Sequence, residues 1–421
     1  MSSSERDSAQ VIVVGGGPAG SATAWALASQ GIDVIVIDKA RFPRDKACAE
    51  YLSPQGSRIL DAMGVLTTVE QAGAAQLSGM RVRSPDGGII HGEFAAQHGF
   101  SGFRDRGLAL RRRQLDPILQ QAARAAGASI REGVALDSLL MRGKAVCGVR
   151  VREDGICSEL RAPLVIGADG LRSGVARQLG LASRLPWPRR VAFVAHYRDV
   201  SGIGGQGEMH VERDGYVGLA DVGHGETNVA IVIPKSLARD AAGDSAGFMD
   251  RWLASHAQLA PRFARATRTG KVLVTGPFAS HARRGVAEGA ALVGDAADFF
   301  DPFTGEGIYA ALRGGELLGD FARDAVRAGS PRAAIAALKA YELARVTEFR
   351  NKWLVERAIG AAVSSAMLMN HAARVLGGRR DLADLLIGVT GDFVPATAVL
   401  RPSFLLNFLD PRSWRSTRQA A

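Results

Sequence analysis

The chain has 421 residues, 47% hydrophobic and 22% charged, which is a globular composition long enough for about two or three structural units. Its cysteines, Cys48, Cys147 and Cys157, are too few for a disulfide framework and favour a reducing compartment. The net charge of +10 is scattered without a basic stripe, which argues against nucleic-acid binding and favours attraction to anionic cofactors, carrier-bound acyl groups or a membrane surface.

The polar N-terminal segment, residues 1–10, lacks the charged-then-apolar pattern of a signal peptide. No run of about 18 apolar residues follows it, so no transmembrane helix is expected. These two features predict a cytoplasmic protein.

The first predicted element is a β-strand that runs into the segment VIVVGGGPAG, residues 11–20. Gly15 allows a tight turn, Gly17 lets the main chain approach a pyrophosphate, and Gly20 lets the next helix lie close to the sheet. Unpaired N–H groups and the helix dipole favour an anion at that helix N-terminus. This spacing predicts a dinucleotide-binding turn.

A helix over residues 19–30 and a second strand over residues 33–37 complete the first unit. The strand ends at Asp38, about 20 residues beyond the glycines, where dinucleotide-binding units place an acidic residue on a ribose. The full order of strand, turn, helix, strand and acid strengthens the glycine motif.

A second, antiparallel sheet is predicted from alternating strand patterns. After a helix over residues 54–63, strands at 79–84 and 89–94 flank a Pro-Asp-Gly-Gly turn and form a hairpin. Four more strands are expected to extend this sheet, at residues 191–197, 207–211, 216–221 and 227–233. Between the two groups we expect a helix at residues 116–126, a strand at 129–132 and a hairpin of strands at 145–152 and 158–161.

Two later strands end in an aspartate. The segment VIGADGLRS at residues 165–173 carries Asp169 and Gly170, and ALVGDAA at residues 291–297 carries Asp295. Parallel sheets present ligand-binding residues at the carboxyl ends of their strands. We expect Asp295 to reach a cofactor hydroxyl and Asp169 to tie together the loop near the pyrophosphate.

From Gly307 onward the pattern is mainly helical, with apolar stretches at residues 361–369 and 393–406. One interpretation is a set of helices that covers the substrate pocket. The other is a surface for a lipid bilayer or a carrier protein.

These motifs, in this order, resemble the FAD-dependent family that contains the aromatic hydroxylases, the flavin-dependent halogenases and the geranylgeranyl reductases. The resemblance covers residues 10–350 and implies an α/β fold: a Rossmann-like FAD-binding domain, an inserted α+β domain with an antiparallel substrate sheet, and a helical C-terminal region. The expected divisions are 1–78, 108–185 and 270–350 for the FAD-binding domain, 79–107 and 186–269 for the substrate domain, and 351–421 for the C-terminal region.

The resemblance also implies the cofactor-binding residues. Arg112 matches an arginine that contacts FAD, with Arg111 and Arg113 as rivals, and the loop PFTGEGI at residues 302–308 resembles the reductase loop against the flavin ring. The expected set is Gly15, Gly17, Pro18, Ala19, Gly20, Asp38, Lys39, Lys46, Arg112, Val134, Asp169, Gly170, Asp295, Pro302, Gly305, Glu306, Gly307 and Ile308.

Two segments bear on the reaction. The loop FPRDKACAEYLSP at residues 42–54 resembles the corresponding loop of the reductase branch. That branch also carries a tyrosine-tryptophan-phenylalanine-proline signature. The aligned residues 215–220 of this chain are GYVGLA, in which only Tyr216 matches the signature. The two-tryptophan halogenase signature is also missing, because Trp187-Pro188 alone does not meet it. This departure favours a substrate other than a polyprenyl chain.

The expected function is therefore an NAD(P)H-dependent FAD monooxygenase that hydroxylates a hydrophobic aromatic or polyketide-like substrate. The alternatives are a reductase of carbon-carbon double bonds in an isoprenoid-like chain, a halogenase, and a flavin-stabilised binding protein without activity. Because no second glycine-rich unit occurs, NAD(P)H is expected to bind transiently in a shared cleft.

No catalytic residue is assigned. The acid-base or pocket candidates are Cys48, Glu50, His196, His210 and Tyr216. The sequence has no metal-binding motif and no nucleophile elbow, so neither a metal site nor serine or cysteine hydrolysis is expected.

Overall fold

The structure, a computed structural model, describes residues 7–409 apart from residues 97, 186, 188, 240 and 242. Residues 1–6, Pro188 and residues 410–421, on which parts of the N-terminal, halogenase-signature and C-terminal predictions rest, lie outside the described residues.

A six-stranded sheet carries the predicted nucleotide-binding motifs. Its strands, in spatial order, are β21 (Val286–Ala287), β22 (Ala290–Leu292), β12 (Leu164–Gly167), β1 (Val11–Val14), β2 (Val34–Asp38) and β8 (Ser129–Glu132). All neighbours pair in parallel except β21 with β22. Every residue of β1 and β12 is buried, because helices and a smaller sheet cover both faces. The glycine turn, Asp169 and Asp295 therefore follow strand ends at one edge of this sheet, and Asp38 is the last residue of β2 at that edge.

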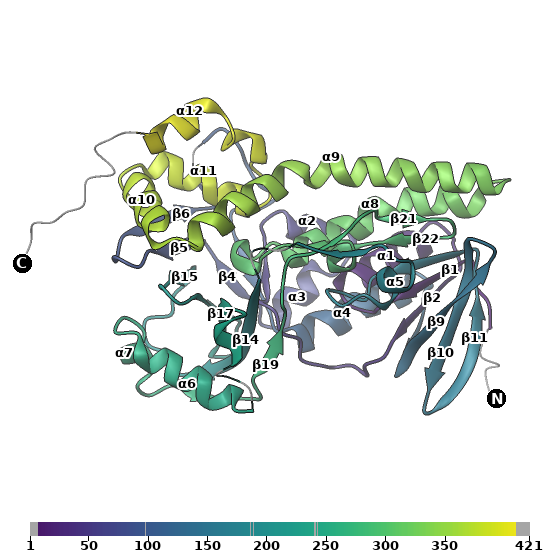
Figure 1. The fold of residues 1–421 in the computed structure, drawn as a ribbon, viewed down its shortest axis with the longest axis horizontal. Helices are drawn as coiled ribbons and strands as arrows, with labels where there is room; N and C mark the ends of the chain where they lie inside the picture. The colour runs from purple at the N-terminus through teal and green to yellow at the C-terminus, as the bar shows by residue number, and fades with distance from the viewer. Residues whose placement is uncertain are drawn as a thin grey trace, which may run out of the picture.

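Helices α1 (Pro18–Ala28), α8 (Gly307–Arg327) and α9 (Pro331–Val363) lie on one face of this sheet. Figure 1 shows α9 running along α8 and continuing over the other half of the molecule. Leu27 and Ala24 of α1 pack in one buried cluster with Leu318 of α8 and Tyr341 of α9. The sequentially distant C-terminal helices thus complete the core beneath the first motif.

The predicted helices at residues 19–30 and 54–63 differ from α1 and α2 (Gly56–Ala62) by one or two residues at their ends, and the start of the helix predicted at 116 is wrong by a full turn. Helix α4 (Arg112–Ala125) begins four residues before the expected start, with Pro117 inside it. The prediction placed the proline in the first turn, where its missing N–H costs nothing. Instead, Leu115 N already donates to Arg111 O at 3.0 Å, and Pro117 forgoes one hydrogen bond in the next turn. Arg112 therefore belongs to the first turn of the helix.

The predicted second sheet is confirmed as an eight-stranded sheet. Its strands, in spatial order, are β18 (Thr267–Arg268), β14 (Arg190–Arg198), β17 (Glu226–Pro234), β16 (Tyr216–Asp221), β15 (Gly207–Val211), β5 (Gly79–Arg83) and β6 (Ile89–Glu93), with β19 (Leu273–Thr275) beside β14. Its pairs are antiparallel except β5 with β15, where the early hairpin joins the later strands. The sheet is therefore assembled from two distant parts of the chain.

The remaining strands form three small sheets of three strands each. One is β9 (Val134–Arg142), β10 (Ala145–Glu153) and β11 (Ile156–Arg161); the second is β3 (Tyr51–Leu52), β7 (Gly107–Ala109) and β4 (Ala75–Leu77); the third is β13 (Ala182–Arg184), β20 (Ser280–Ala282) and β23 (Asp298–Phe299). The long strand β9 was not predicted, because its mostly half-exposed residues lack a clear alternation of buried and exposed positions.

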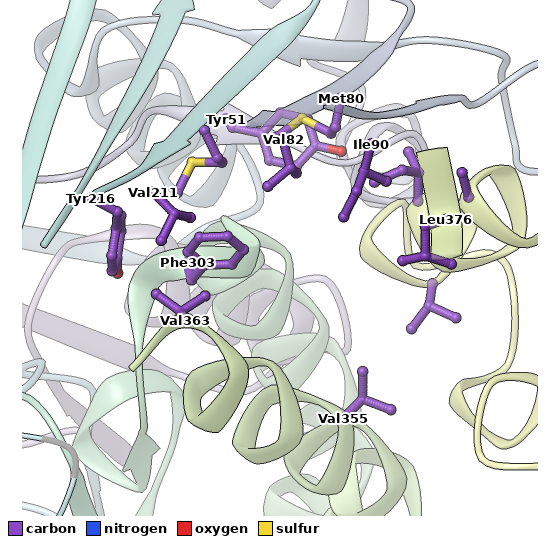
Figure 2. Close-up of a cluster of buried hydrophobic side chains, with 14 of the residues drawn as sticks. Tyr51, Met80, Val82, Ile90, Val211, Tyr216, Phe303, Val355, Val363 and Leu376 are labelled. Carbon is purple, nitrogen blue, oxygen red and sulfur yellow. The ribbon is translucent and has the colours of Figure 1, made fainter. Parts of the chain in front are cut away.

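The remaining α-helices are α2 (Gly56–Ala62), α3 (Leu66–Gln71), α5 (Gly174–Gln178), α6 (Ser245–Ser255), α7 (Ala260–Phe263), α10 (Ala366–Gly377), α11 (Arg380–Thr390) and α12 (Pro402–Leu405). Helices α10 and α11 pack on β6. Ile90 and Leu376 lie in one buried cluster (Figure 2), and Ile387 belongs to the same cluster. Among the described residues, no helix combines the length and apolar character needed to cross a bilayer.

Candidate functional site

A cavity of about 800 Å³ lies between the carboxyl edge of the six-stranded sheet, one face of the eight-stranded sheet and helix α9. Every residue of the expected cofactor-binding set lines this cavity except Gly20. Gly20 has a packing position instead, because a Cβ there would lie 1.7 Å from Gly15 O. The sequence motifs thus converge on a single space.

The glycine turn leaves its cavity side open. Gly15 has a φ of +109°, and a Cβ there would lie 2.4 Å from Ala168 O, so only glycine fits. A Cβ on Gly17 would meet no atom closer than Arg112 Nη2 at 3.5 Å and Arg44 Nη2 at 3.8 Å. The turn therefore presents its backbone and the start of α1 to a space flanked by two guanidinium groups, as an anionic ligand requires.

Asp38 braces this turn. Its Oδ2 accepts a hydrogen bond from Gly16 N at 2.8 Å, and its Oδ1 accepts one from Ala40 N at 2.8 Å. A carboxylate oxygen can accept more than one hydrogen bond, so Asp38 can still accept from a ligand hydroxyl. Lys39 follows directly and also lines the cavity.

Asp169 holds the loop after β12. Its Oδ2 accepts hydrogen bonds from Gly174 N at 2.6 Å and Val175 N at 3.3 Å, at the start of α5. Its Oδ1 is buried and, among the described residues, has no hydrogen-bond partner. Arg44 Nη1 is in the same situation, and both residues line the cavity. Buried polar atoms of this kind indicate a polar ligand, since leaving them unpaired is costly.

Arg112 is fixed by a buried carboxylate. Its Nε donates to Asp116 Oδ1 at 2.6 Å and its Nη2 to Asp116 Oδ2 at 2.9 Å. Arg111 pairs instead with Glu226 and Asp45, and neither it nor the exposed Arg113 lines the cavity. Arg112 is therefore the arginine that the structure places at the candidate site.

Burial shifts the pKa values of Lys46 and Asp295 in opposite directions, whereas the Arg112 charge lowers both. Burial, with the nearby Arg112 and Arg44 guanidinium groups, lowers the pKa of Lys46. Burial raises the pKa of Asp295, while Lys46 and Arg112 oppose that rise. The two side chains thus partly neutralise each other across the cavity.

The loop between β23 and α8 forms the middle of the cavity wall. Asp301 caps its start by accepting from Phe303 N at 3.1 Å, and Glu306 stands immediately before α8. The carboxylate of Glu306 is buried and pairs with Lys352 Nζ at 2.9 Å. Helix α8 therefore directs its N-terminus, with its positive dipole end, at the cavity.

The other wall is apolar. Met80, Met209 and Phe278 line it from different elements, and Tyr216 packs edge-on against Phe303 with ring centroids 5.0 Å apart (Figure 2). Tyr216 OH donates to Asp301 Oδ1 at 2.7 Å. Burial, and then the Asp301 charge, raise the pKa of Tyr216 well above its ordinary value. Its hydroxyl is thus engaged with the protein.

Two pocket candidates lie outside this cavity. Glu50, at a positive φ of 60° and 1% exposed, accepts from Arg112 N at 2.8 Å and Asn228 Nδ2 at 3.0 Å. Its Oε2 also lies 2.6 Å from His196 Nε2, and neither Glu50 nor His196 lines the cavity. These polar groups satisfy one another and join α4 to the eight-stranded sheet.

His210 is also displaced from the expected position. Residues alternate across a strand, and the neighbouring Met209 lines the large cavity while His210 does not. His210 instead lines a separate cavity of about 400 Å³, where its Nε2 lies 2.8 Å from Glu208 Oε2 and 3.3 Å from Arg262 Nη1. The expectation that His210 faces the substrate pocket is therefore wrong.

Cys48 does line the large cavity. Its Sγ accepts a weak hydrogen bond from Glu50 N at 3.3 Å. Burial raises the pKa of the Cys48 thiol, although the Arg112 charge opposes the rise. The side chain is therefore a neutral thiol rather than a reactive thiolate.

The sequence analysis expected C-terminal helices over the substrate pocket but named no residue of the wall that one of them forms. Helix α9 lines the cavity with Tyr341, Arg345, Phe349, Lys352, Trp353 and Glu356. Apart from the adjacent Lys352 and Trp353, their spacing of three or four residues places them on one face of the helix, and that periodicity was the signal available in the sequence. In the part of the chain that the structure describes, no group of three or more His, Cys, Asp or Glu residues could hold a metal ion.

Comparison with known proteins agrees with this geometry. Residues 8–319 match the family model described as FAD binding domain. Digeranylgeranylglycerophospholipid reductase 2 of Methanopyrus kandleri is 31% identical over 400 residues, which is 92% of this chain and 94% of that protein. A solved geranylgeranyl bacteriochlorophyll reductase-like protein from Thermoplasma acidophilum has a TM-score of 0.71 and 21% identity over 96% of both chains.

A solved myxobacterial chondrochloren halogenase has a TM-score of 0.77 and 22% identity over 83% of this chain and 82% of its own. Structures this distant in sequence share the fold. The chain belongs to the family defined by the FAD binding domain, and it is an FAD-dependent oxidoreductase.

Proposed function

We propose that this oxidoreductase saturates carbon-carbon double bonds in an isoprenoid-like chain. The observation that carries the proposal is the match to the Methanopyrus kandleri reductase, which covers 92% of the chain and so extends beyond the FAD binding domain. This reverses the order expected from the sequence motifs, in which monooxygenation came first. The apolar cavity wall is compatible with a hydrocarbon chain.

The residues that would hold FAD follow from the cavity. The glycine turn, the N-terminus of α1, Arg44 and Arg112 would bind the pyrophosphate, and Asp38 and Asp295 would accept hydrogen bonds from cofactor hydroxyls. The unpartnered Asp169 Oδ1 and Arg44 Nη1 would find partners in the same ligand. Bound FAD supplies the hydride chemistry that the protein side chains cannot provide.

The protein's own contribution is orientation and exclusion of water. The loop at residues 302–308 would lie against the flavin ring, where the positive end of α8 favours the negative charge of the reduced ring. Met80, Met209 and Phe278 would pack the substrate chain against that ring. Val134 and Lys46 would complete the cofactor side of the cavity.

Three further points belong to this proposal. NAD(P)H would deliver the electrons from a transient position in the shared cavity, and the enzyme would work in the cytoplasm with a lipid-like or carrier-bound substrate. Exposed apolar side chains near the C-terminal helices, Met367, Leu406 and Leu409, would make peripheral membrane contact. The chain would divide into an FAD-binding domain (1–78, 108–185 and 270–350), a substrate domain (79–107 and 186–269) and a C-terminal region (351–421).

A monooxygenase remains the second candidate because the aromatic-proline signature of the reductases is absent after Tyr216. The experiment that separates the two follows NAD(P)H oxidation by the FAD-loaded protein in an oxygen electrode, with polyprenyl compounds and hydrophobic phenols. Anaerobic turnover to a product heavier by two hydrogens supports the reductase. Substrate-stimulated oxygen uptake with an oxygenated product contradicts it.

A further inference from the structure

The cavity face of α9 carries three charged side chains, and two of them are paired. Arg345 pairs with Asp298 and Glu342, and Lys352 pairs with Glu306. Lys352 also pairs with Asp392, a residue whose side chain is buried. Glu356, one helical turn beyond Lys352, lines the cavity and makes no hydrogen bond or ion pair with any residue that the structure describes.

The carboxylates near Glu356 each have a cation of their own. Glu306 pairs with Lys352, Asp298 with Arg345, and Asp301 with Arg190 at 2.5 Å. Among the residues that the structure describes, no arginine or lysine forms an ion pair with Glu356, and Lys352 acts on it only through its charge. The groups that act on its charge are Glu306, Lys352, Asp301 and Asp298.

This arrangement disfavours a charged Glu356. Burial, followed by the nearby charge of Glu306, raises the pKa of Glu356 to about 8, and Lys352 only partly opposes the rise. Near neutral pH the side chain is then mostly a carboxylic acid with a proton to give.

We propose that Glu356 is the proton donor in double-bond reduction. This inference rests on the proposed reductase function. The Glu356 O–H bond breaks and its proton forms a new C–H bond with the π electron pair at one carbon, while the other carbon receives a hydride from reduced FAD. FAD is left oxidised by two electrons, NAD(P)H reduces it again, and the Glu356 carboxylate regains a proton from solvent.

The thiol and phenol groups of the cavity are poorer donors. Tyr216 OH already donates to Asp301, and burial raises the pKa of Cys48. Tyr51 OH lacks a partner among the described residues, but burial and then Glu306 raise the pKa of Tyr51 well above its ordinary value. The raised pKa of Glu356, about 8, still lies below the ordinary values of a thiol and a phenol, so Glu356 is the preferred source.

The first test measures protonation without turnover. Infrared difference spectra of the FAD-loaded enzyme, taken as the pH rises through 8, should show loss of a protonated carboxyl band. The band should be absent in Glu356→Gln and present in Glu348→Gln, a matched change on α9 outside the cavity. Persistence of the band in Glu356→Gln overturns the proposal.

The second test separates proton donation from the function itself. Glu356→Gln should lower the anaerobic rate of double-bond reduction by about 100-fold or more, while flavin reduction by NAD(P)H stays normal. Wild-type kcat should fall as the pH rises through about 8, because the acid form is lost, and Glu356→Asp should restore part of the rate. Tyr51→Phe should leave that pH dependence in place.

Two adverse results have different meanings. A working reductase whose rate is unchanged in Glu356→Gln overturns proton donation by Glu356 alone. A wild-type enzyme that oxygenates its substrate and saturates none overturns both the proposed function and this inference.

Discussion

The two walls of the large cavity are built in different ways. The wall at the edge of the six-stranded sheet uses backbone turns and carboxylates placed directly after strands, such as Gly15, Asp38 and Asp169. The opposite wall uses side chains from the eight-stranded sheet and α9, such as Met209, Ala230 and Glu356. A fixed cofactor requires backbone geometry that tolerates little change, whereas a substrate pocket can change one side chain at a time.

The largest expected effect comes from a substitution that distorts the backbone of the wall at the six-stranded sheet. Gly20→Val would force a side chain to within 1.7 Å of Gly15 O, which the turn cannot relieve by a rotamer change. We expect loss of bound FAD and destabilisation by about 3 kcal/mol or more. Flavin absorbance per polypeptide and thermal unfolding measure both. Gly329→Ala is the control, because a Cβ there meets no atom within 4 Å; equal loss in both variants would contradict the packing role.

A side-chain change in the same wall should weaken FAD and spare the fold. Asp295→Ala removes a buried carboxylate proposed to accept from a cofactor hydroxyl. Loss of such a charged hydrogen bond corresponds to about a tenfold to hundredfold rise in the Kd for FAD. Fluorescence titration of the apoprotein with FAD gives the constant. An unchanged Kd would remove Asp295 from the proposed cofactor set.

A change in the wall formed by the eight-stranded sheet and α9 should impair substrate turnover and leave FAD binding unchanged. Ala230→Leu, on β17, adds bulk to the apolar side of the cavity without touching the glycine turn. We expect kcat/KM to fall about tenfold for long-chain substrates, with the FAD content unchanged. Steady-state kinetics with substrates of increasing chain length provide the measurement. A parallel loss of FAD would show that the two walls are not separable.

The smallest expected effect is centred on the cavity beside His210, which shares Glu208 with the large cavity. Although burial opposes the shift, hydrogen bonds from His210 and then Arg262 lower the pKa of Glu208 to about 2. A carboxylate with a depressed pKa stabilises the fold above its unfolded value, and that contribution is lost as the pH falls toward 2.

Arg262→Ala should raise the pKa of Glu208 toward its ordinary value, so acid unfolding begins at higher pH. The loss at neutral pH should be about 1 kcal/mol, because Glu208 keeps its hydrogen bond with His210. Circular dichroism during acid titration measures the shift, and kcat/KM should stay at the wild-type value. A changed kcat/KM would connect this second cavity to the reaction.

The wall at the edge of the six-stranded sheet was predictable from the sequence, because its key residues lie close together in the chain. Gly15, Gly17 and Asp38 act through the backbone of one strand-turn-helix unit, so their spacing alone places them. Glu50 and His210 could not be placed this way. Whether a polar side chain faces the cavity or a buried partner depends on Asn228 or Arg262, which are far away in the chain.

The wall formed by α9 also depends on contacts between distant parts of the chain, which the sequence alone does not reveal. The sequence predicted helices after residue 307, and the helices are confirmed. Which face of α9 meets the cavity depends on how it packs along α8, so Lys352 and Glu356 were not recognised. Helical periodicity identifies a face but does not identify what that face contacts.

The hydrogen bonds of the Glu50 carboxylate link the proposed cofactor site to the substrate sheet. It receives a hydrogen bond from the first turn of α4, which positions Arg112, and it also binds Asn228 and His196 of the eight-stranded sheet. We therefore expect strain that substrate imposes on that sheet to reach the first turn of α4, beside the proposed pyrophosphate position. Linkage requires the influence to be mutual: if substrate tightens FAD binding by some factor, FAD tightens substrate binding by the same factor.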